Sequence, residues 1–342
     1  MQNKITTPAK LLNEKGELNI KGYANSLILD YDRNDIKASS FRIKEWDYYL
    51  IYDKEYAIAL TIDDNSYMGL ISASIIDYTK PKEITQSKMT IYPNGSTNLP
   101  NSSKIGDTIY KDNYLHFQFL NDGKTRKIKV HYSQFYDKKD LDVDLELTDE
   151  PDDSMVIATP FKEDPLAFYY NQKIIGMKVK GYFKHGDLEH TFKEGLGILD
   201  WGRGVWTYDN TWNWSAACGY VNGEVFGFNL GYGFGDTSNA TENMLFYKGK
   251  AHKLKNVYFV IPKDNKGNDN FMETWSFISD DGRFEMYFEP IINRKAYMTA
   301  IILSSDQNQV FGKFTGYAIL DDGTKIEVNN FIGFAEKVRN KW

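Results

Sequence analysis

The sequence predicts an all-β protein built from two similar antiparallel β-barrel modules in tandem. Three observations lead to this prediction: apolar and polar residues alternate along many short segments, Asp and Gly recur at the turns between them, and one long segment is repeated. Aromatic residues make up 15% of the 342 residues. They favour strands, because an aromatic ring packs well across a pleated surface. We expect no helix of normal length.

Period-two alternation is clearest in two segments. Residues 142–148 (DVDLELT) place Val143, Leu145 and Leu147 on one face and acidic side chains on the other. Residues 283–289 (RFEMYFE) alternate in the same way. One apolar face and one polar face are typical of an antiparallel sheet that covers a core. Stretches containing Asp and Gly lie between such segments and supply the positive φ that tight hairpins require.

The internal repeat joins residues 171–200 to residues 308–336. Both segments begin with Asn-Gln, contain Gly-Tyr and turn at a Gly/Asp tip. Each reaches a glycine that is followed three residues later by an acid, which is Asp200 in the first segment and Glu336 in the second. Two weaker matches keep the same order: 45–62 with 211–230, and 117–132 with 275–290.

Duplication of this kind predicts one module over residues 1–200 and a second over residues 201–342. Modules of this length with a meander pattern suit up-and-down barrels, which leave no free strand edge.

Composition excludes several function classes. A net charge of −6 argues against nucleic-acid binding, which needs a basic surface. No apolar run has the length of a signal peptide or membrane segment, so we expect a cytoplasmic protein. A single cysteine excludes an internal disulfide and any cysteine-based zinc site. The five histidines show no ligand spacing, so we expect no metal.

The most unusual segment is residues 197–219 (GILDWGRGVWTYDNTWNWSAACG), which hold four of the seven tryptophans. It lies where the two modules meet, and such junctions favour ligand sites. Asp200 sits beside Trp201; an aspartate desolvated by aromatic rings can hold a proton and serve as a general acid. The alternative is structural: Asp200 pairs with Arg203 or caps a turn, and its counterpart Glu336 supports that reading.

The aromatic residues of this segment could wall a pocket for an apolar, sugar or cationic group. For each tryptophan taken singly, a place in the barrel core is the alternative. A polar loop at 236–243 could add hydrogen-bonding groups at the mouth of a site, although an ordinary surface loop explains it equally well. The candidate ligand-binding residues are Trp201, Trp206, Tyr208, Trp212, Trp214, Asn229, Glu242 and Asn243.

Four strings carry a family resemblance: LDWGRGVWTYDNTWNW, GFNLGYGFGDTSNATENMLFYKGKAHKL, GRFEMYFEP and FGKFTGYAILDDG. Together with ITTPAKLL and FRIKEWDYY near the N-terminus, they make the chain resemble, over essentially its full length, the family called domain of unknown function 2804. At greater distance the chain is similar to tandem lipocalin-like proteins, among them the hydroxyneurosporene synthase-like and AttH-like groups. The resemblance implies two lipocalin-like barrels with a ligand site near an acid and tryptophans.

The leading hypothesis is a protein that binds a small hydrophobic molecule, isoprenoid or lipid-like, and transforms it without a cofactor. In a hydration or cyclisation, Asp200 would donate the proton and Arg203 would orient it. We expect Asp200 and Trp212 to face the largest cavity. The alternatives are a non-catalytic lipocalin-like carrier, and a carbohydrate-binding or glycoside-hydrolysing protein that uses Asp200 with Glu242. The sequence does not specify an oligomeric state.

Overall fold

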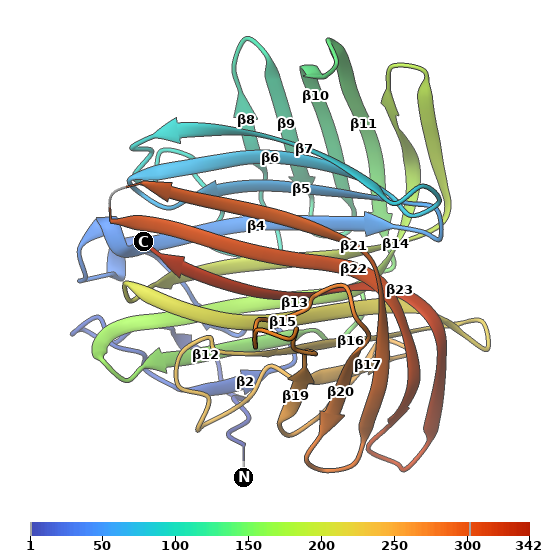
Figure 1. The fold of residues 1–342 in the computed structure, drawn as a ribbon. Coiled ribbons are helices and arrows are strands. Elements are labelled where there is room, and N and C mark those ends of the chain that lie inside the picture. The colour runs from blue at the N-terminus through green and yellow to red at the C-terminus, as the bar shows by residue number, and fades with distance from the viewer. Residues whose placement is uncertain (1, 301) are drawn as a thin grey trace.

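The computed structural model describes residues 2–300 and 302–342, and most of these residues form β-strands (Figure 1). The helices in these ranges are two 3₁₀ helices of three residues each, η1 (Arg33–Asp35) and η2 (Ser40–Arg42). The predicted all-β class is therefore confirmed. No helix in the described ranges is long and apolar enough to cross a membrane.

The first sheet has twelve strands and curls strongly (Figure 1). Its main path runs β7-β6-β5-β4-β14-β13-β11-β10-β9-β8, while β12 pairs with β13 and β2 pairs with β12. The strands are β2 (Gly22–Ala24), β4 (Ile43–Tyr52), β5 (Tyr56–Asp64), β6 (Met68–Asp77), β7 (Lys82–Ile91), β8 (Thr108–Lys111), β9 (Leu115–Asn121), β10 (Arg126–Tyr136), β11 (Lys139–Thr148), β12 (Met155–Phe161), β13 (Asp164–His185) and β14 (Leu188–Val205).

The second sheet has nine strands in the order β18-β17-β16-β15-β23-β22-β21-β20-β19. A separate parallel pair joins β1 (Ala9–Lys10) to β3 (Leu29–Asp30). The strands of the second sheet are β15 (Asp209–Val221), β16 (Glu224–Tyr232), β17 (Met244–Tyr247), β18 (Lys250–Lys253), β19 (Val257–Val260), β20 (Trp275–Ser279), β21 (Phe284–Ala300), β22 (Leu303–Ile319) and β23 (Lys325–Lys341).

The two sheets share one strand order. In each, the last strand lies between the first long strand and the penultimate long strand: β14 between β4 and β13, and β23 between β15 and β22. The repeated segments 171–200 and 308–336 thus form hairpins at matching places. The chain is two tandem lipocalin-like modules, while a domain boundary at residue 200 remains a prediction.

One of the weaker sequence matches is displaced by a strand. Residues 275–290 fall in β20 and β21, and β21 pairs directly with β22. Residues 117–132 fall in β9 and β10, and β11 separates β10 from β13. Every hairpin of a meander shares the same alternation and turn chemistry, so local similarity does not distinguish neighbouring hairpins.

The pairing of residues across the strands refines the alignment of segment 171–200 with segment 308–336. Lys173 lies opposite Asp200, and Gln309 lies opposite Glu336. Lys173 is therefore the structural counterpart of Gln309, one residue away from the match that the shared Asn-Gln pair suggested.

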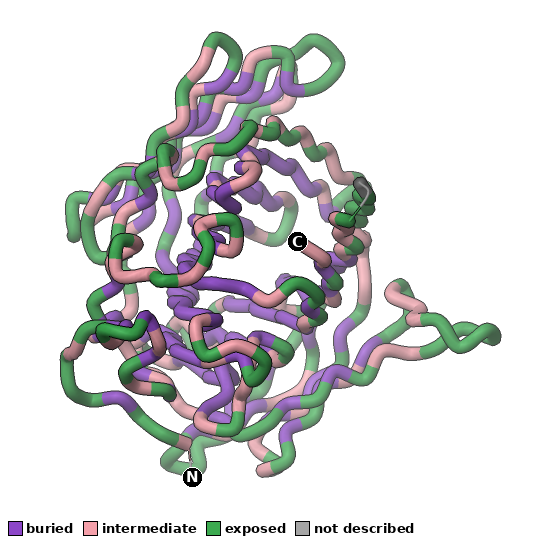
Figure 2. Tube along the Cα trace, turned by 90° about the vertical axis from the view of Figure 1, so that its left-hand side faces the viewer, coloured by how far each residue is buried: buried purple, intermediate pink, exposed green. Residues whose placement is uncertain are grey.

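The sheets pack together through matching faces. The rings of Tyr48 on β4 and Trp214 on β15 meet edge to face, with centroids 6.1 Å apart. Further along the same strands, the Cys218 amide donates a hydrogen bond of 2.7 Å to the Tyr52 hydroxyl. Because β4 and β15 hold the same place in their sheets, the interface has approximate two-fold symmetry. Buried residues fill the centre of the molecule, and exposed ones gather at the hairpin ends (Figure 2).

Candidate functional site

Strand alternation on β14 separates the residues that the sequence grouped together. Adjacent strand residues point to opposite faces. Asp200 points toward the interface with the second sheet. On that face it contacts Lys173 of the neighbouring strand β13. Trp201 and Arg203 face the interior of the first module. Arg203 thus does not contact Asp200, and the structure does not support an orienting role for it.

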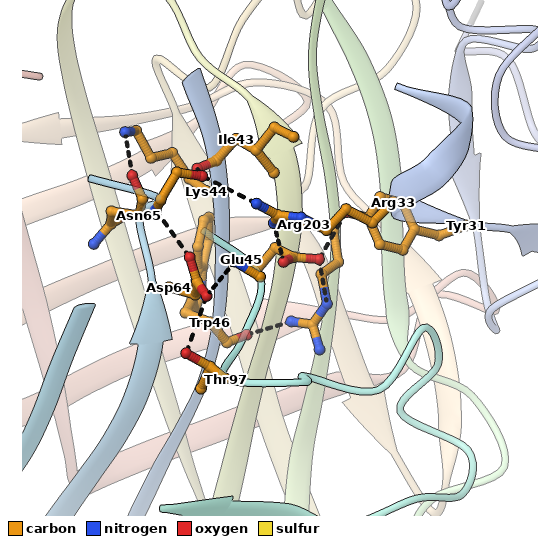
Figure 3. Close-up of polar contacts among 12 residues, drawn as sticks. Tyr31, Arg33, Ile43, Lys44, Glu45, Trp46, Asp64, Asn65, Thr97 and Arg203 are labelled. Atoms are coloured by element: carbon orange, nitrogen blue, oxygen red, sulfur yellow. Dashed lines mark hydrogen bonds and ion pairs between the residues drawn. The ribbon is translucent and has the colours of Figure 1, made fainter. Parts of the chain in front are cut away.

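Arg203 instead belongs to a buried charge network inside the first module (Figure 3). Both terminal nitrogens of its guanidinium donate to Asp47 Oδ1 at 3.1 Å, and the group lies 4.3 Å from the centre of the Trp201 ring. Glu45 lies between Arg203 and Arg33 (Figure 3). Such a network holds strands in place, so we assign Arg203 and Trp201 to the core.

Asp200 is held by a cation and an amide on the neighbouring strand β13. Lys173 Nζ lies 2.7 Å from Asp200 Oδ1, and Asn171 Nδ2 donates to the same oxygen at 2.7 Å. Lys173 is only 1% exposed, and its ammonium also lies 3.8 Å from the centre of the Trp214 ring on β15. A buried carboxylate with a cation in direct contact is stabilised in its charged form. The ion pair lies within the first sheet, and the contact between Lys173 and Trp214 links it to the second sheet.

Glu336 holds the matching position in the second sheet, but its hydrogen-bond partners are neutral. Trp212 Nε1 donates to Oε1 at 3.0 Å, and Gln309 Nε2 donates to Oε2 at 3.0 Å. Burial raises the pKa of Glu336 to about 7, against the opposing effects of these hydrogen bonds and of the Lys173 and Arg294 charges. Desolvation without a direct cation favours the protonated acid.

Glu242 adds a third carboxyl group from the loop between β16 and β17. Asn229 Nδ2 donates to it at 3.3 Å, and Trp214 Nε1 donates to Asn229 Oδ1 at 2.8 Å. A Cβ atom at Gly231 would lie 2.5 Å from Glu242 Oε1, so the glycine leaves room for the carboxyl group in this position. Burial raises the pKa of Glu242 to about 7, while Lys173 opposes the shift.

Several buried polar atoms on these facing surfaces have no hydrogen-bond partner in the described structure. Leaving such an atom unsatisfied costs about 1–3 kcal/mol. Their concentration beside the carboxyl groups therefore marks a place that is suited to bind a polar molecule. These atoms are Tyr48 Oη, Tyr78 Oη, Tyr169 Oη, Asn171 Oδ1 and Gln309 Oε1.

An aromatic group closes one end of the interface. The Trp206 ring lies 5.5 Å from Trp212 and 6.1 Å from Trp46, measured between centroids. The Trp46 ring lies so flat on Gly202 that a Cβ there would approach it to 2.1 Å. Trp206 is 2% exposed, so it packs as core and borders the carboxyl cluster through the rings of Trp212 and Tyr169.

Two further predicted residues lie outside the cluster's polar contacts. Tyr208 is 49% exposed, and its hydroxyl donates to the Ile302 carbonyl. Asn243 accepts from the Gly231 amide and donates to the Lys255 carbonyl, each at 2.8 Å. The structure thus brings together, of the predicted site residues, Asp200, Trp212, Trp214, Asn229 and Glu242.

Sequence reasoning missed the residues that surround these carboxyl groups from other strands. Lys173 carried a signal: with Asn171 and Gln172 it forms a polar triplet between two apolar stretches of a repeated strand. Tyr48 and Gln309 carried none, because only the ladder registers place them beside Asp200 and Glu336.

A wide cleft lies elsewhere, at the hairpin end of the interface. It is an open cleft of about 1240 Å³ whose lining includes Tyr52, His190, Cys218 and Phe331. Neither Asp200 nor Trp212 lines this cleft, so the expectation that both residues face the largest cavity is not met there. Burial raises the pKa of the Cys218 thiol to about 12, which leaves it unreactive at neutral pH.

Potential metal ligands do not gather anywhere in the described ranges: no group of three or more His, Cys, Asp or Glu side chains is placed to hold an ion.

Comparison with known proteins agrees with this architecture. The family model described as Domain of unknown function (DUF2804) matches residues 2–342, so the chain belongs to that family. No curated protein matches the chain. A crystal structure described as an AttH from Nitrosomonas europaea is similar, with a TM-score of 0.54, 11% identity and coverage of 90% of this chain and 96% of that one. Kievitone hydratase from Nectria haematococca is similar too, with a TM-score of 0.53, 9% identity and 98% coverage of both chains. At these identities the likeness shows the fold.

Proposed function

We propose that this member of the DUF2804 family is a cofactor-independent acid–base enzyme that adds water to, or removes it from, a small hydrophobic molecule bound between the two sheets. One observation carries the proposal. The two modules present matching carboxyl groups on the faces that pack together, and their partners differ: a cation for Asp200, neutral groups for Glu336. Pairs of titratable groups with opposed environments are what acid–base catalysis uses.

The roles follow from the two environments. Glu336, whose pKa burial raises to about 7, supplies a proton to one carbon of a double bond. Asp200, charged beside Lys173, accepts a proton from the water whose oxygen bonds to the other carbon. The net change is addition of one water, and exchange with solvent restores both carboxyl groups. We therefore propose Glu336, in place of Asp200, as the acid.

The surroundings suit a hydrophobic molecule with some polar groups. Ile175, Ile198, Phe311 and Phe334 continue the same two faces and are buried. The unpartnered hydroxyls of Tyr48 and Tyr169 can hydrogen-bond a bound molecule. Structural likeness to a hydratase adds support, although it rests on the fold.

The test is a conversion assay. Purified full-length protein is incubated with a small-molecule extract of its own host in ¹⁸O-labelled water, and mass spectrometry follows any compound that gains or loses one water. We expect D200N and E336Q to slow the conversion by about 100-fold or more. The exposed Glu327→Gln serves as the matched control. Conversion by D200N at the wild-type rate would refute the proposal.

A non-catalytic carrier is the second candidate, and the open cleft favours it. Its volume of about 1240 Å³ can hold a drug-sized ligand, and it is separate from the carboxyl cluster. Native mass spectrometry of protein from its own host would then show a retained lipophile that D200N also retains. The carbohydrate alternative gains no support, because Trp201, Trp206 and Trp214 are buried and offer no open platform for a sugar ring.

A further inference from the structure

Arg294 on β21 reaches from the second sheet to the first. It pairs in register with Gln309, which in turn lies opposite Glu336, so the three side chains form a row across adjacent strands. Arg294 Nη1 donates to Ser74 Oγ on β6 at 2.7 Å. Within the part of the chain that the structure describes, the Arg294 guanidinium makes no ion pair, and the residue is half-buried. The carboxyl group on which its charge acts is that of Glu336, whose pKa it lowers without a direct contact.

Two unpartnered hydroxyls share the interface with this guanidinium. Tyr48 and Tyr78 are 7% and 8% exposed, and neither hydroxyl meets hydrogen-bond geometry with another described residue, although the Gln309 amide lies near that of Tyr48. The Tyr78 ring packs against Phe311, which lies two residues from Gln309 on β22. Burial raises the pKa of Tyr48 to about 12, and the positive charge of Arg294 opposes that shift. Both tyrosines thus remain hydrogen-bond donors at neutral pH.

The repeat does not account for Arg294. Lys173 is the ladder counterpart of Gln309, and Lys173 pairs with Met155 on β12. The first module therefore has an apolar residue where the second has an arginine. An arginine that the shared architecture does not need, and that contacts no carboxylate among the described residues, has donors left for a bound molecule.

We propose that the molecule bound between the sheets carries a carboxylate, which Arg294 binds together with the hydroxyls of Tyr48 and Tyr78. This inference rests on the proposed function, and it narrows the substrate class to an unsaturated carboxylic acid with an apolar body. A guanidinium and neutral hydroxyl donors match the charge and geometry of one carboxylate. With its carboxylate on Arg294, the bound molecule would extend along the row Arg294–Gln309–Glu336. Its double bond, a few atoms from the carboxylate, would then lie toward Glu336, the proposed acid.

Isothermal titration with two matched probes tests the inference. The probes are trans-cinnamate and trans-cinnamamide, which differ in the charged group and share the apolar body. The full-length wild type is compared with Arg294→Gln and with Arg339→Gln. Arg339 belongs to the same sheet and pairs with Asp209 at the surface, so its variant loses the same charge away from the interface. Thermal melts confirm that each variant is folded.

We expect the wild type and R339Q to bind cinnamate, and R294Q to bind it about tenfold or more weakly, because the lost bonds are charge-assisted. Cinnamamide should bind weakly to all three proteins. Equal affinity of R294Q and wild type for cinnamate would overturn the inference. So would equal binding of amide and carboxylate, or no cinnamate binding to the wild type. Failure of the proposed function would be seen in a different experiment, the conversion assay, in which D200N would then convert the substrate at the wild-type rate.

Discussion

The surroundings of Asp200 and Glu336 show how a duplicated fold can produce two different carboxyl groups. Both residues occupy the same place in their sheets, and both face the interface. Asp200 contacts Lys173 at 2.7 Å, whereas Glu336 contacts the amide of Gln309 at the matching ladder position. Burial raises the pKa of Glu336 to about 7, and the lysine at Asp200 against the glutamine at Glu336 is the difference between their direct partners.

This comparison also explains why the cluster lies between the modules. A face that packs on its own counterpart brings two copies of each residue close together. Divergence at one copy is then enough to give the two carboxyl groups different partners. The charged network of Arg203, which lies on the opposite face of the first sheet, has no such neighbour across the interface.

The largest expected effect comes from removing the cation. Lys173→Met should cost about 3–5 kcal/mol in the free energy of unfolding, because it leaves the Asp200 carboxylate buried without its partner. Urea denaturation measures the change, and adding Asp200→Asn should recover most of it. The surface variant Lys341→Met, whose pair with Asp209 is exposed, should cost at most about 1 kcal/mol. A K173M loss as small as that of K341M would contradict the ion-pair assignment.

Substituting Arg203 separates stability from chemistry. Arg203→Met leaves Asp47 and Glu45 buried without this guanidinium, so we again expect a loss of about 3–5 kcal/mol. The residual folded protein should convert its substrate at the wild-type rate, unlike K173M. If R203M converts the substrate more slowly than the wild type at temperatures where the variant is fully folded, Arg203 would belong to the functional site.

Glu336 should make stability depend on pH. Its pKa is about 7 in the folded protein and 4.5 as the unperturbed value, so the folded state binds more protons between these values. The stabilisation is complete below about pH 4.5 and is lost as pH rises through about 7, a change of about 3 kcal/mol. Relative to Glu336→Gln, the wild type should therefore lose stability over this window. Parallel stability curves for the two proteins would show that Glu336 is charged throughout.

Trp214 should have a smaller effect. Trp214→Phe removes the donor to Asn229 and weakens the contact with the Lys173 ammonium, for a cost of about 1–3 kcal/mol. Trp275→Phe is the matched control, because Trp275 is equally buried but lies in the core of the second module. Only W214F should shift the pKa of Glu336. An equal shift in W275F would mean that either substitution disturbs the packing of the whole protein.

Tyr208 should have the smallest effect. Tyr208→Phe removes a hydroxyl that bonds the Ile302 carbonyl at the surface, and we expect a change within about 0.5 kcal/mol. Retained ligands and conversion should match the wild type. A clear loss of binding in this variant would show that the site extends to the tip of the β21–β22 hairpin.

The sequence allowed the fold to be predicted well, because alternation and turn residues are local signals. The repeat also located Glu336 as the counterpart of Asp200. The site was predicted only in part, since residues 197–219 are close in sequence but alternate between two faces of a sheet. Tyr48, Lys173 and Gln309 reach the site through strand pairing, and register is a long-range property that a single segment does not encode.

The most direct test of the account is difference infrared spectroscopy of the two carboxyl groups at about pH 6, below the value of about 7 given for Glu336. Subtracting the spectrum of E336Q from that of the wild type should reveal the band of a protonated carboxylic acid. Subtracting the spectrum of D200N should reveal the bands of a carboxylate. Carboxylate bands in both differences would contradict the central claim that the matching residues are an acid and a base.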